Sequence, residues 1–117
     1  MNLAAQRKVT QAFIAVRPES IVFTPRHKEK KPAGGFVWVE DAARAPQTVT
    51  FIEPGSAPLP TVTLDGIVRV VEMQVVAAWD AAIERFDVFT HQGKDWEVVD
   101  LFYDNGYETR ALVSGRG

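Results

Sequence analysis

Alternating apolar and polar positions dominate the last third of the chain and predict β-strands there. Segments 85–90 and 95–103 alternate in this way, and they flank a polar loop in which Gly93 supplies a positive-φ conformation. An Asp-Asn-Gly sequence at 104–106 then precedes a third such segment, 107–113. Asn-Gly between two alternating segments favours a tight hairpin turn. The pattern predicts a three-stranded antiparallel meander in which 107–113 pairs with 95–103.

The stretch from Gly66 to Trp79 is the longest apolar-rich part of the chain, and its residues are mainly β-branched. Apolar positions occupy both alternating sides, which is typical of a strand covered on both faces. We therefore predict one long strand that lies centrally in a barrel or beneath a helix. Asp80–Ile83 is predicted to be a turn, either irregular or a single helical turn capped by Asp80.

The N-terminal residues 2–16 have a helical pattern. Small and apolar residues recur every 3.5 positions and form one apolar stripe, which consists of Ala5, Val9, Ala12 and Val16, with Phe13 beside them. Arg17-Pro18 ends the helix, because proline disfavours helical dihedrals in the residue before it. This segment, 1–17, is the predicted N-terminal helix.

All seven prolines lie within the first 60 residues, so this half should have short elements and long connections. Short strands are predicted at 20–24, 36–40 and 47–53, followed by an extended connector at 54–60. Residues 25–35 have two prolines, two glycines and no periodicity, and are predicted to form a long, mobile, projecting loop.

These elements define a mainly β fold: a small antiparallel β-barrel or sandwich with an N-terminal α-helix and a long projecting loop. The 117 residues suit one domain, 1–117, in which the barrel spans 20–113 and 114–117 form a tail. A hydrophobic content of 46% is that of a globular chain.

The charge is unevenly distributed, although the net charge is only −2. Residues 1–34 contain seven basic and two acidic residues, a net charge of +5, whereas residues 80–108 contain eight acidic and two basic residues, a net charge of −6. Such a chain can associate head-to-tail with copies of itself or dock on oppositely charged surfaces. The alternative, which the sequence supports equally well, is that the basic residues of 1–34 and the acidic residues of 80–108 are simply exposed to solvent.

The sequence contains no convincing catalytic or metal-binding constellation. There is no cysteine, and neither histidine, His27 or His91, has a neighbour at metal-ligand spacing. The acidic residues near His91 are interpreted as strand-end and turn residues rather than as an acid–base set; they are Asp95, Asp100 and Asp104. We expect no enzymatic activity, no catalytic or metal-binding residue and no cofactor. No 18-residue apolar run or signal peptide is present, so no membrane association is expected.

The loop at 25–35 is the strongest candidate for a binding site. Its basic side chains could contact nucleic-acid phosphates. These residues are Arg26, His27, Lys28, Lys30 and Lys31. No aromatic residue interleaves them, so base reading is not expected. The alternative is a solubilising loop tip. Trp38, beside this loop, is a candidate interface residue.

Several short motifs resemble those of the head-to-tail stopper (head-closure) proteins of long-tailed phages. The loop ends in Gly34-Gly35-Phe36-Val37-Trp38, and Arg44-Ala45-Pro46-Gln47 precedes a strand. The closing segments are Phe86-Asp87-Val88-Phe89, Gly93, Trp96-Glu97-Val98 and Gly106 to Ala111. Phe86 stands where glycine is common in that family. The similarity spans about residues 20–113, and its motifs are loose.

This resemblance implies a structural subunit of the phage neck. Such proteins form a homo-oligomeric ring, typically of twelve subunits, beneath the portal and adaptor rings. The ring retains packaged double-stranded DNA and presents the surface on which the tail docks. The location would be the virion neck, with assembly in the host cytoplasm. The loop would project into the channel and touch DNA non-specifically, and candidate interface residues would be Trp38, Arg44, Asp87 and Glu97.

Two other assignments remain open. One is a different neck subunit or a tail-terminator subunit. The other is a stand-alone small β-barrel that binds nucleic acid non-specifically through the 25–35 loop.

Overall fold

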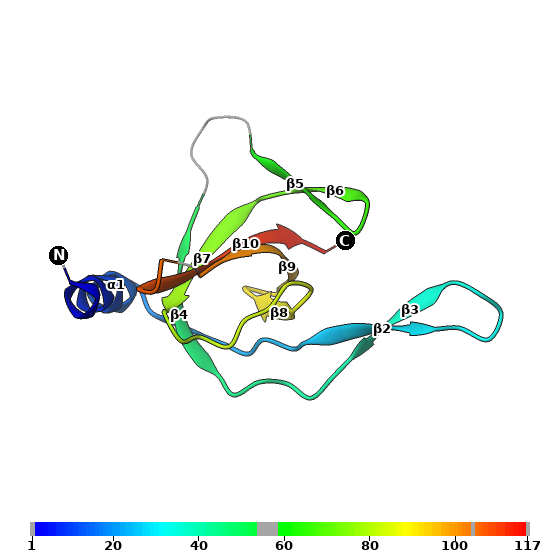
Figure 1. The fold of residues 1–117 in the computed structure, drawn as a ribbon, viewed down its shortest axis with the longest axis horizontal. Coiled ribbons are helices and arrows are strands. Elements are labelled where there is room, and N and C mark those ends of the chain that lie inside the picture. The colour runs from blue at the N-terminus through cyan, green and yellow to red at the C-terminus, as the bar shows by residue number, and fades with distance from the viewer. Residues whose placement is uncertain (1, 54–58, 104, 117) are drawn as a thin grey trace.

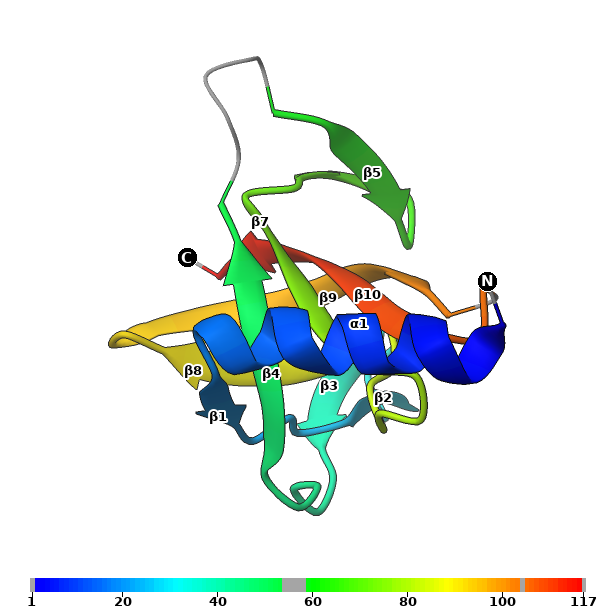
Figure 2. The same cartoon turned by 90° about the vertical axis from the view of Figure 1, so that its left-hand side faces the viewer.

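The computed structural model describes residues 2–53, 59–103 and 105–116. A six-stranded antiparallel sheet curls into a nearly closed barrel, and a helix lies across its outside (Figures 1 and 2). Along the sheet the strands are β1 (Glu19–Ile21), β4 (Gln47–Ile52), β7 (Met73–Ala78), β10 (Glu108–Gly115), β9 (Lys94–Phe102) and β8 (Val88–His91). The predicted fold class, a mainly β chain with an N-terminal helix, is confirmed.

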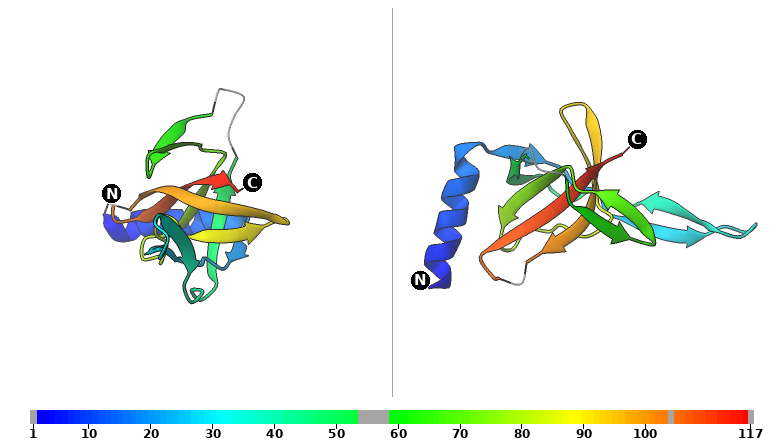
Figure 3. Two further views of the ribbon diagram at one scale, coloured as in Figure 1. Left: turned by 90° about the vertical axis from the view of Figure 1, so that its right-hand side faces the viewer. Right: turned by 90° about the horizontal axis from the view of Figure 1, so that it is seen from above.

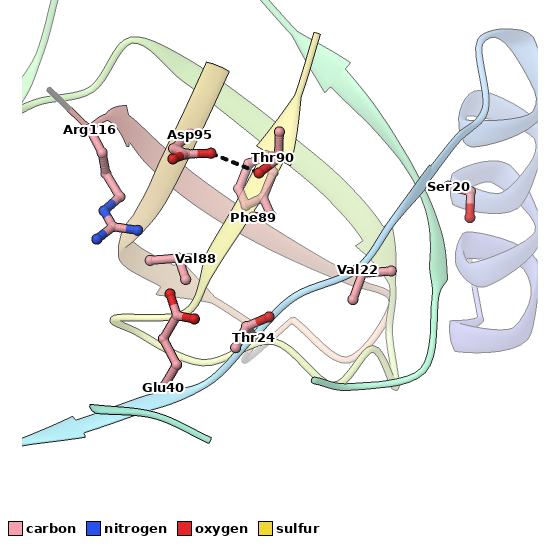
Figure 4. A pocket seen from close by; sticks show the side chains of 9 residues that line it. All are labelled: Ser20, Val22, Thr24, Glu40, Val88, Phe89, Thr90, Asp95 and Arg116. Atoms are coloured by element: carbon pink, nitrogen blue, oxygen red, sulfur yellow. Dashed lines mark hydrogen bonds between the residues drawn. The ribbon is translucent and has the colours of Figure 1, made fainter. Parts of the chain in front are cut away.

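The two edge strands of the sheet, β1 and β8, meet at one isolated bridge among the described residues. Thr24 and Val88 exchange backbone hydrogen bonds of 2.8 and 2.9 Å there. The predicted strand 20–24 is thus a three-residue strand followed by this bridge. Beyond the bridge the edges separate around a cavity of about 460 Å³, with Ser20 and Val22 on one side and Phe89 and Thr90 on the other (Figure 4). The barrel is therefore closed at one point and open beside it.

The barrel interior is filled by every second residue of the sheet. Six inward side chains have no exposed surface, and they are Phe23, Val49, Val75, Val98, Ala111 and Val113. On β7, Met73, Val75 and Ala77 face this core, whereas the equally buried Val76 lies on the other face. The central strand is thus covered on both sides, as its two-sided apolar pattern predicted.

The helix α1 (Leu3–Val16) packs across β4 and β7. Asn2 caps its first turn by accepting a 2.8 Å hydrogen bond from the backbone N–H of Ala5. An apolar stripe ordinarily marks the buried side of a helix. Here the buried residues are Thr10 and Ile14 instead, and most of the predicted stripe is exposed: Val9, Ala12, Phe13 and Val16.

The long strand predicted for residues 66–79 is wrong, because the segment is divided between two strands. β6 (Ile67–Val70) leaves the sheet and pairs with β5 (Thr61–Leu64), and only β7 belongs to the barrel. Asp65 and Gly66 make the turn between β5 and β6 with φ values of 55° and 76°. The connector predicted at 54–60 lies outside the described residues for 54–58, and 59–60 have no regular structure.

The break between β6 and β7 occurs at Glu72, which is held by the end of β10. Its backbone N–H donates to the carbonyl oxygen of Val113 at 2.9 Å, and its carboxylate accepts the N–H of Gly115. The N–H of Gly115, together with Lys94 and Ser114, lowers the pKa of Glu72. Since β10 continues to Gly115, the predicted tail 114–117 begins within a strand.

The β5–β6 hairpin folds back over the outer face of the sheet. Leu64 and Val71 form a second small core there with Val99 of β9. Val99 points outward because it follows Val98, which faces the barrel core, and alternate strand residues lie on opposite faces. A β-bulge comes next: Leu112 of β10 pairs with Asp100, but Val113 pairs with Val98. The bulge shifts the alternation, so that Leu101 again packs against the barrel core.

The predicted meander is confirmed, with shifted bounds. β9 pairs with β8 and β10, and Gln92-Gly93 makes the first turn with φ values of 53° and 74°. Of the second turn, Asp104 lies outside the described residues, and the Asn105 side chain accepts the N–H groups of residues 107 and 108. Residues 85–87 precede β8 rather than belonging to it, and 80–83 contain no helical turn.

Candidate functional site: the projecting basic hairpin

The basic segment that was predicted to be a loop is largely a β-hairpin. β2 (Arg26–Lys30) pairs with β3 (Phe36–Glu40), from Arg26 opposite Glu40 to Lys30 opposite Phe36. This hairpin extends away from the barrel, at the end of the molecule opposite α1 (Figures 1 and 3). It accounts for much of the longest dimension of the molecule, 54 Å. The projection was expected, whereas the regular pairing was not.

The free end of the hairpin is a turn across residues 31–35. The N–H of Gly34 donates to the carbonyl of Lys31, and the N–H of Lys31 donates to the carbonyl of Gly35, both at 3.0 Å. Gly34 and Gly35 have φ values of 94° and 75°, which is why two glycines stand here. Lys30 and Lys31 are exposed beside this turn, and the ion pairs within the described ranges involve neither of them.

The other predicted cations of this segment have partners. Lys28 forms an ion pair with Asp65 at the turn of the β5–β6 hairpin. The ring nitrogens of His27 lie 2.9 Å from carboxylate oxygens of Glu29 and Asp41. These hydrogen bonds, first that to Glu29 and then that to Asp41, raise the pKa of His27. The cations free to meet an external phosphate are therefore concentrated at the tip.

Arg26 holds the root of the hairpin and does not face solvent. Its guanidinium pairs with Glu97 of β9, and both side chains are only 5% exposed. Its Nε donates to the carbonyl oxygen of Phe86 at 2.8 Å. Glu97 also accepts from Arg69 of β6 at 3.1 Å. Arg26, which was predicted to face DNA, thus anchors the hairpin root, and Glu97, which was predicted to lie at an interface, is its buried partner.

Trp38 completes this root. Its ring lies 4.8 Å from that of Phe86 and 4.6 Å from the guanidinium carbon of Arg26. Phe86 itself has a φ of 73°, in the left-handed region that costs a non-glycine residue about 1–2 kcal/mol. Residue 86 thus has a glycine-like conformation, and its ring packs against that of Trp38. Trp38 is half-buried within the chain.

Arg44 and Asp87, the other predicted interface residues, bind each other. Arg44 Nε lies 3.0 Å from Oδ2 of Asp87, whose side chain is 1% exposed and also accepts the N–H of Glu84. Asp87 and the nearby Glu84 raise the pKa of Arg44. This pair fixes the connection between β3 and β4 to the turn before β8. It is a contact within the chain between two residues that were predicted to lie at an interface.

The structure adds three anchors of the hairpin root that were not among the predicted site residues: Asp65, Arg69 and Phe86. Asp65-Gly66 is a hairpin signal that the sequence displays. Arg69 gives no such signal, because only the pairing of distant strands brings it to Glu97.

Within the described parts of the chain, no group of three His, Asp or Glu residues is placed to hold a metal ion. The one described helix is too short and too polar to cross a membrane. No family model matches the chain, and no curated protein is significantly similar to it.

Proposed function

We propose that this protein is a structural subunit of a phage head–tail connector, a stopper or head-completion ring that retains packaged DNA and joins the tail to the portal. The observation that supports this most is the basic hairpin. A two-stranded arm with lysines at its tip is held on a barrel by a buried ion pair, and a helix lies at the opposite end.

The hairpin suits contact with DNA inside a ring. Two neighbouring lysines attract phosphates without reading sequence, which is what a protein that holds any genome segment requires. The pairing of β2 with β3 and the Arg26–Glu97 contact keep the arm at a defined angle. In a ring, the tips of all copies would form one basic collar around the duplex.

The decisive test of the class combines genomic position and imaging. The gene is expected beside genes for a portal, a major capsid protein and a tail tube, and the protein should add a ring beneath the portal of DNA-filled capsids in cryo-electron microscopy. A gene outside any such cluster, and no density on portal-bearing capsids, would overturn the proposal. Density at the tail end instead would assign the protein to the tail-terminator subunits.

The lysine tip is tested separately with the variant Lys30→Gln/Lys31→Gln. We expect it to assemble on portals but to release DNA, and to lose salt-sensitive binding to a random-sequence duplex in fluorescence anisotropy. With two phosphates neutralised per subunit, the slope of log affinity against log salt should fall by about 1.8 per engaged subunit. Lys94→Gln/Arg116→Gln removes the same charge elsewhere and should retain binding. Salt-sensitive duplex binding by a protein that never joins a portal would favour the stand-alone nucleic-acid-binding barrel.

A further inference from the structure

One flank of α1 is an apolar surface that is largely exposed in the monomer. Val9, Phe13 and Val16 are 59%, 48% and 76% exposed, and alanines lie between them. Three apolar side chains aligned on one side of a helix are more than scattered surface hydrophobics. Val9 and Phe13 border a shallow groove between α1 and the start of β10, beside Tyr107 and Arg110.

A second apolar surface lies beside the hairpin root. It is an open groove of about 840 Å³ between the turn that follows β7 and the end of β9. Its aromatic residues are Trp79, Phe86, Phe102 and Tyr103. Phe102 and Tyr103 are 48% and 64% exposed, so the groove is uncovered in the monomer. Arg7 of α1 lies over the Trp79 ring, 3.7 Å from its centroid, so α1 of the same chain borders the groove at this residue.

The charges of the two surfaces are opposite. Residues 2–18 contain Arg7, Lys8 and Arg17 and no acidic residue. The groove is bordered by the exposed carboxylate of Asp80 and by that of Glu84, which is exposed but also lies 3.4 Å from Arg44. Arg85 is paired with Asp100 at 2.9 Å. An apolar helix flanked by cations therefore matches an apolar groove flanked by acids.

We infer that the exposed face of α1 docks in the aromatic groove of a second copy of this chain. The two surfaces differ, so the contact is heterologous and each copy still offers one free surface of each kind. Repeated contacts of this type close into a ring when the rotation between copies permits it. The inference deepens the proposed function, on which the existence of a ring rests, by naming the surfaces that join its subunits.

Docking at the groove also reaches the basic hairpin. Phe86 lines the groove and at the same time packs on Trp38, while its carbonyl oxygen accepts from Arg26. A neighbouring helix in the groove would therefore stabilise the hairpin root of the copy that receives it.

The test uses two variants with changes only at exposed positions. Val9→Gln/Phe13→Gln/Val16→Gln removes the helix face and keeps good helix formers. Phe102→Thr/Tyr103→Thr removes the groove rim. Each should raise the dissociation constant of self-association roughly a hundredfold in sedimentation equilibrium, because several buried apolar side chains are lost. Circular dichroism should show both variants folded.

A matched control removes exposed apolar surface elsewhere. Ile67→Thr/Val68→Thr alters the β5–β6 hairpin, where both residues are more than half exposed, and should leave self-association unchanged. An equal mixture of the helix-face and groove variants should form heterodimers and nothing larger, because one intact contact remains. This outcome is specific to a head-to-tail contact between these two surfaces.

Three results would overturn the inference: a wild-type protein that stays monomeric up to millimolar concentration, assembly that resists both variants, or a variant mixture without heterodimers. Each leaves the connector proposal standing if the protein still adds a ring to portal-bearing capsids. Conversely, self-association that depends on both surfaces, with no portal binding, would retain this contact and reject the connector.

Discussion

The buried Arg26–Glu97 pair is the contact whose removal should be most informative. Replacing Glu97 with glutamine keeps the size of the side chain but removes the charge that faces Arg26 and Arg69. Removing one partner of a buried ion pair costs about 3–5 kcal/mol, because the other charge stays buried without compensation. A domain is stable by only about 5–15 kcal/mol, so this is a large fraction.

The measurement is urea unfolding of Glu97→Gln, followed by tryptophan fluorescence and circular dichroism. For a domain of this size, the expected loss corresponds to a fall in Tm of about 10–25 °C. Native-state hydrogen exchange should show the amides of β2 and β3 exchanging faster than those of the barrel, because the hairpin root is released. Glu53→Gln, at an exposed position, should change stability by less than about 0.5 kcal/mol.

The two partners of Glu97 differ in burial, and this difference allows a control within the same set of residues. Arg69 is 31% exposed, so Arg69→Gln leaves the Arg26–Glu97 pair in place and should cost only about 1 kcal/mol. Replacing both Arg26 and Glu97 with methionine should destabilise the protein less than Glu97→Gln alone, because the buried charge of Arg26 is removed and the charge left without its partner, that of Arg69, is partly exposed to solvent. If Glu97→Gln costs no more than Arg69→Gln, the reasoning about the anchor is refuted.

Three further predictions concern the hairpin and the core. The pKa of His27 is raised by Glu29 and Asp41, so the contribution of His27 to hairpin stability should be complete below about pH 6.5 and disappear as pH rises through the raised pKa. Amide hydrogen exchange of the hairpin should therefore accelerate over that pH range in the wild type but not in His27→Asn. A wild-type exchange rate that does not change over this range would contradict the prediction. Phe86→Gly should change the free energy of unfolding by less than about 1 kcal/mol, because relief of the strain at positive φ offsets the lost ring contact. Phe86→Val should lower the free energy of unfolding by more than about 2 kcal/mol, because it loses the ring and keeps the strain. Equal thermal stability of the two variants would exclude strain at this position. Phe23→Ala should cost about 3–5 kcal/mol in urea unfolding, and a loss below about 1.5 kcal/mol would be incompatible with its fully buried position.

Local patterns were sufficient for the elements whose interactions lie close together in the chain. The N-terminal helix, its end at Pro18 and the closing meander followed from periodicity, proline and turn glycines. Each depends on contacts between neighbouring residues or on a hairpin with a short turn, and such contacts leave a signature in the order of residues.

The elements that were predicted wrongly depend on distant partners. The stretch from Gly66 to Trp79 is equally suited to one strand or two, and the break at Glu72 exists because β10, about 40 residues further on, binds it. Likewise, Arg26 in a run of cations gives no sign that Glu97 of β9 neutralises it. A solvated cation and a buried one have the same local sequence.

The sequence by itself therefore determined the fold class, the helix, the meander and the presence of a basic, glycine-ended segment that projects. Only the tertiary structure decided which cations remain free and which side of α1 is covered. The physical reason is that burial and ion pairing depend on which surfaces meet after the chain has folded, and this information is distributed over residues far apart. The structure leaves Lys30 and Lys31 exposed at the tip of the hairpin, and it exposes the helix face that periodicity alone would assign to the core.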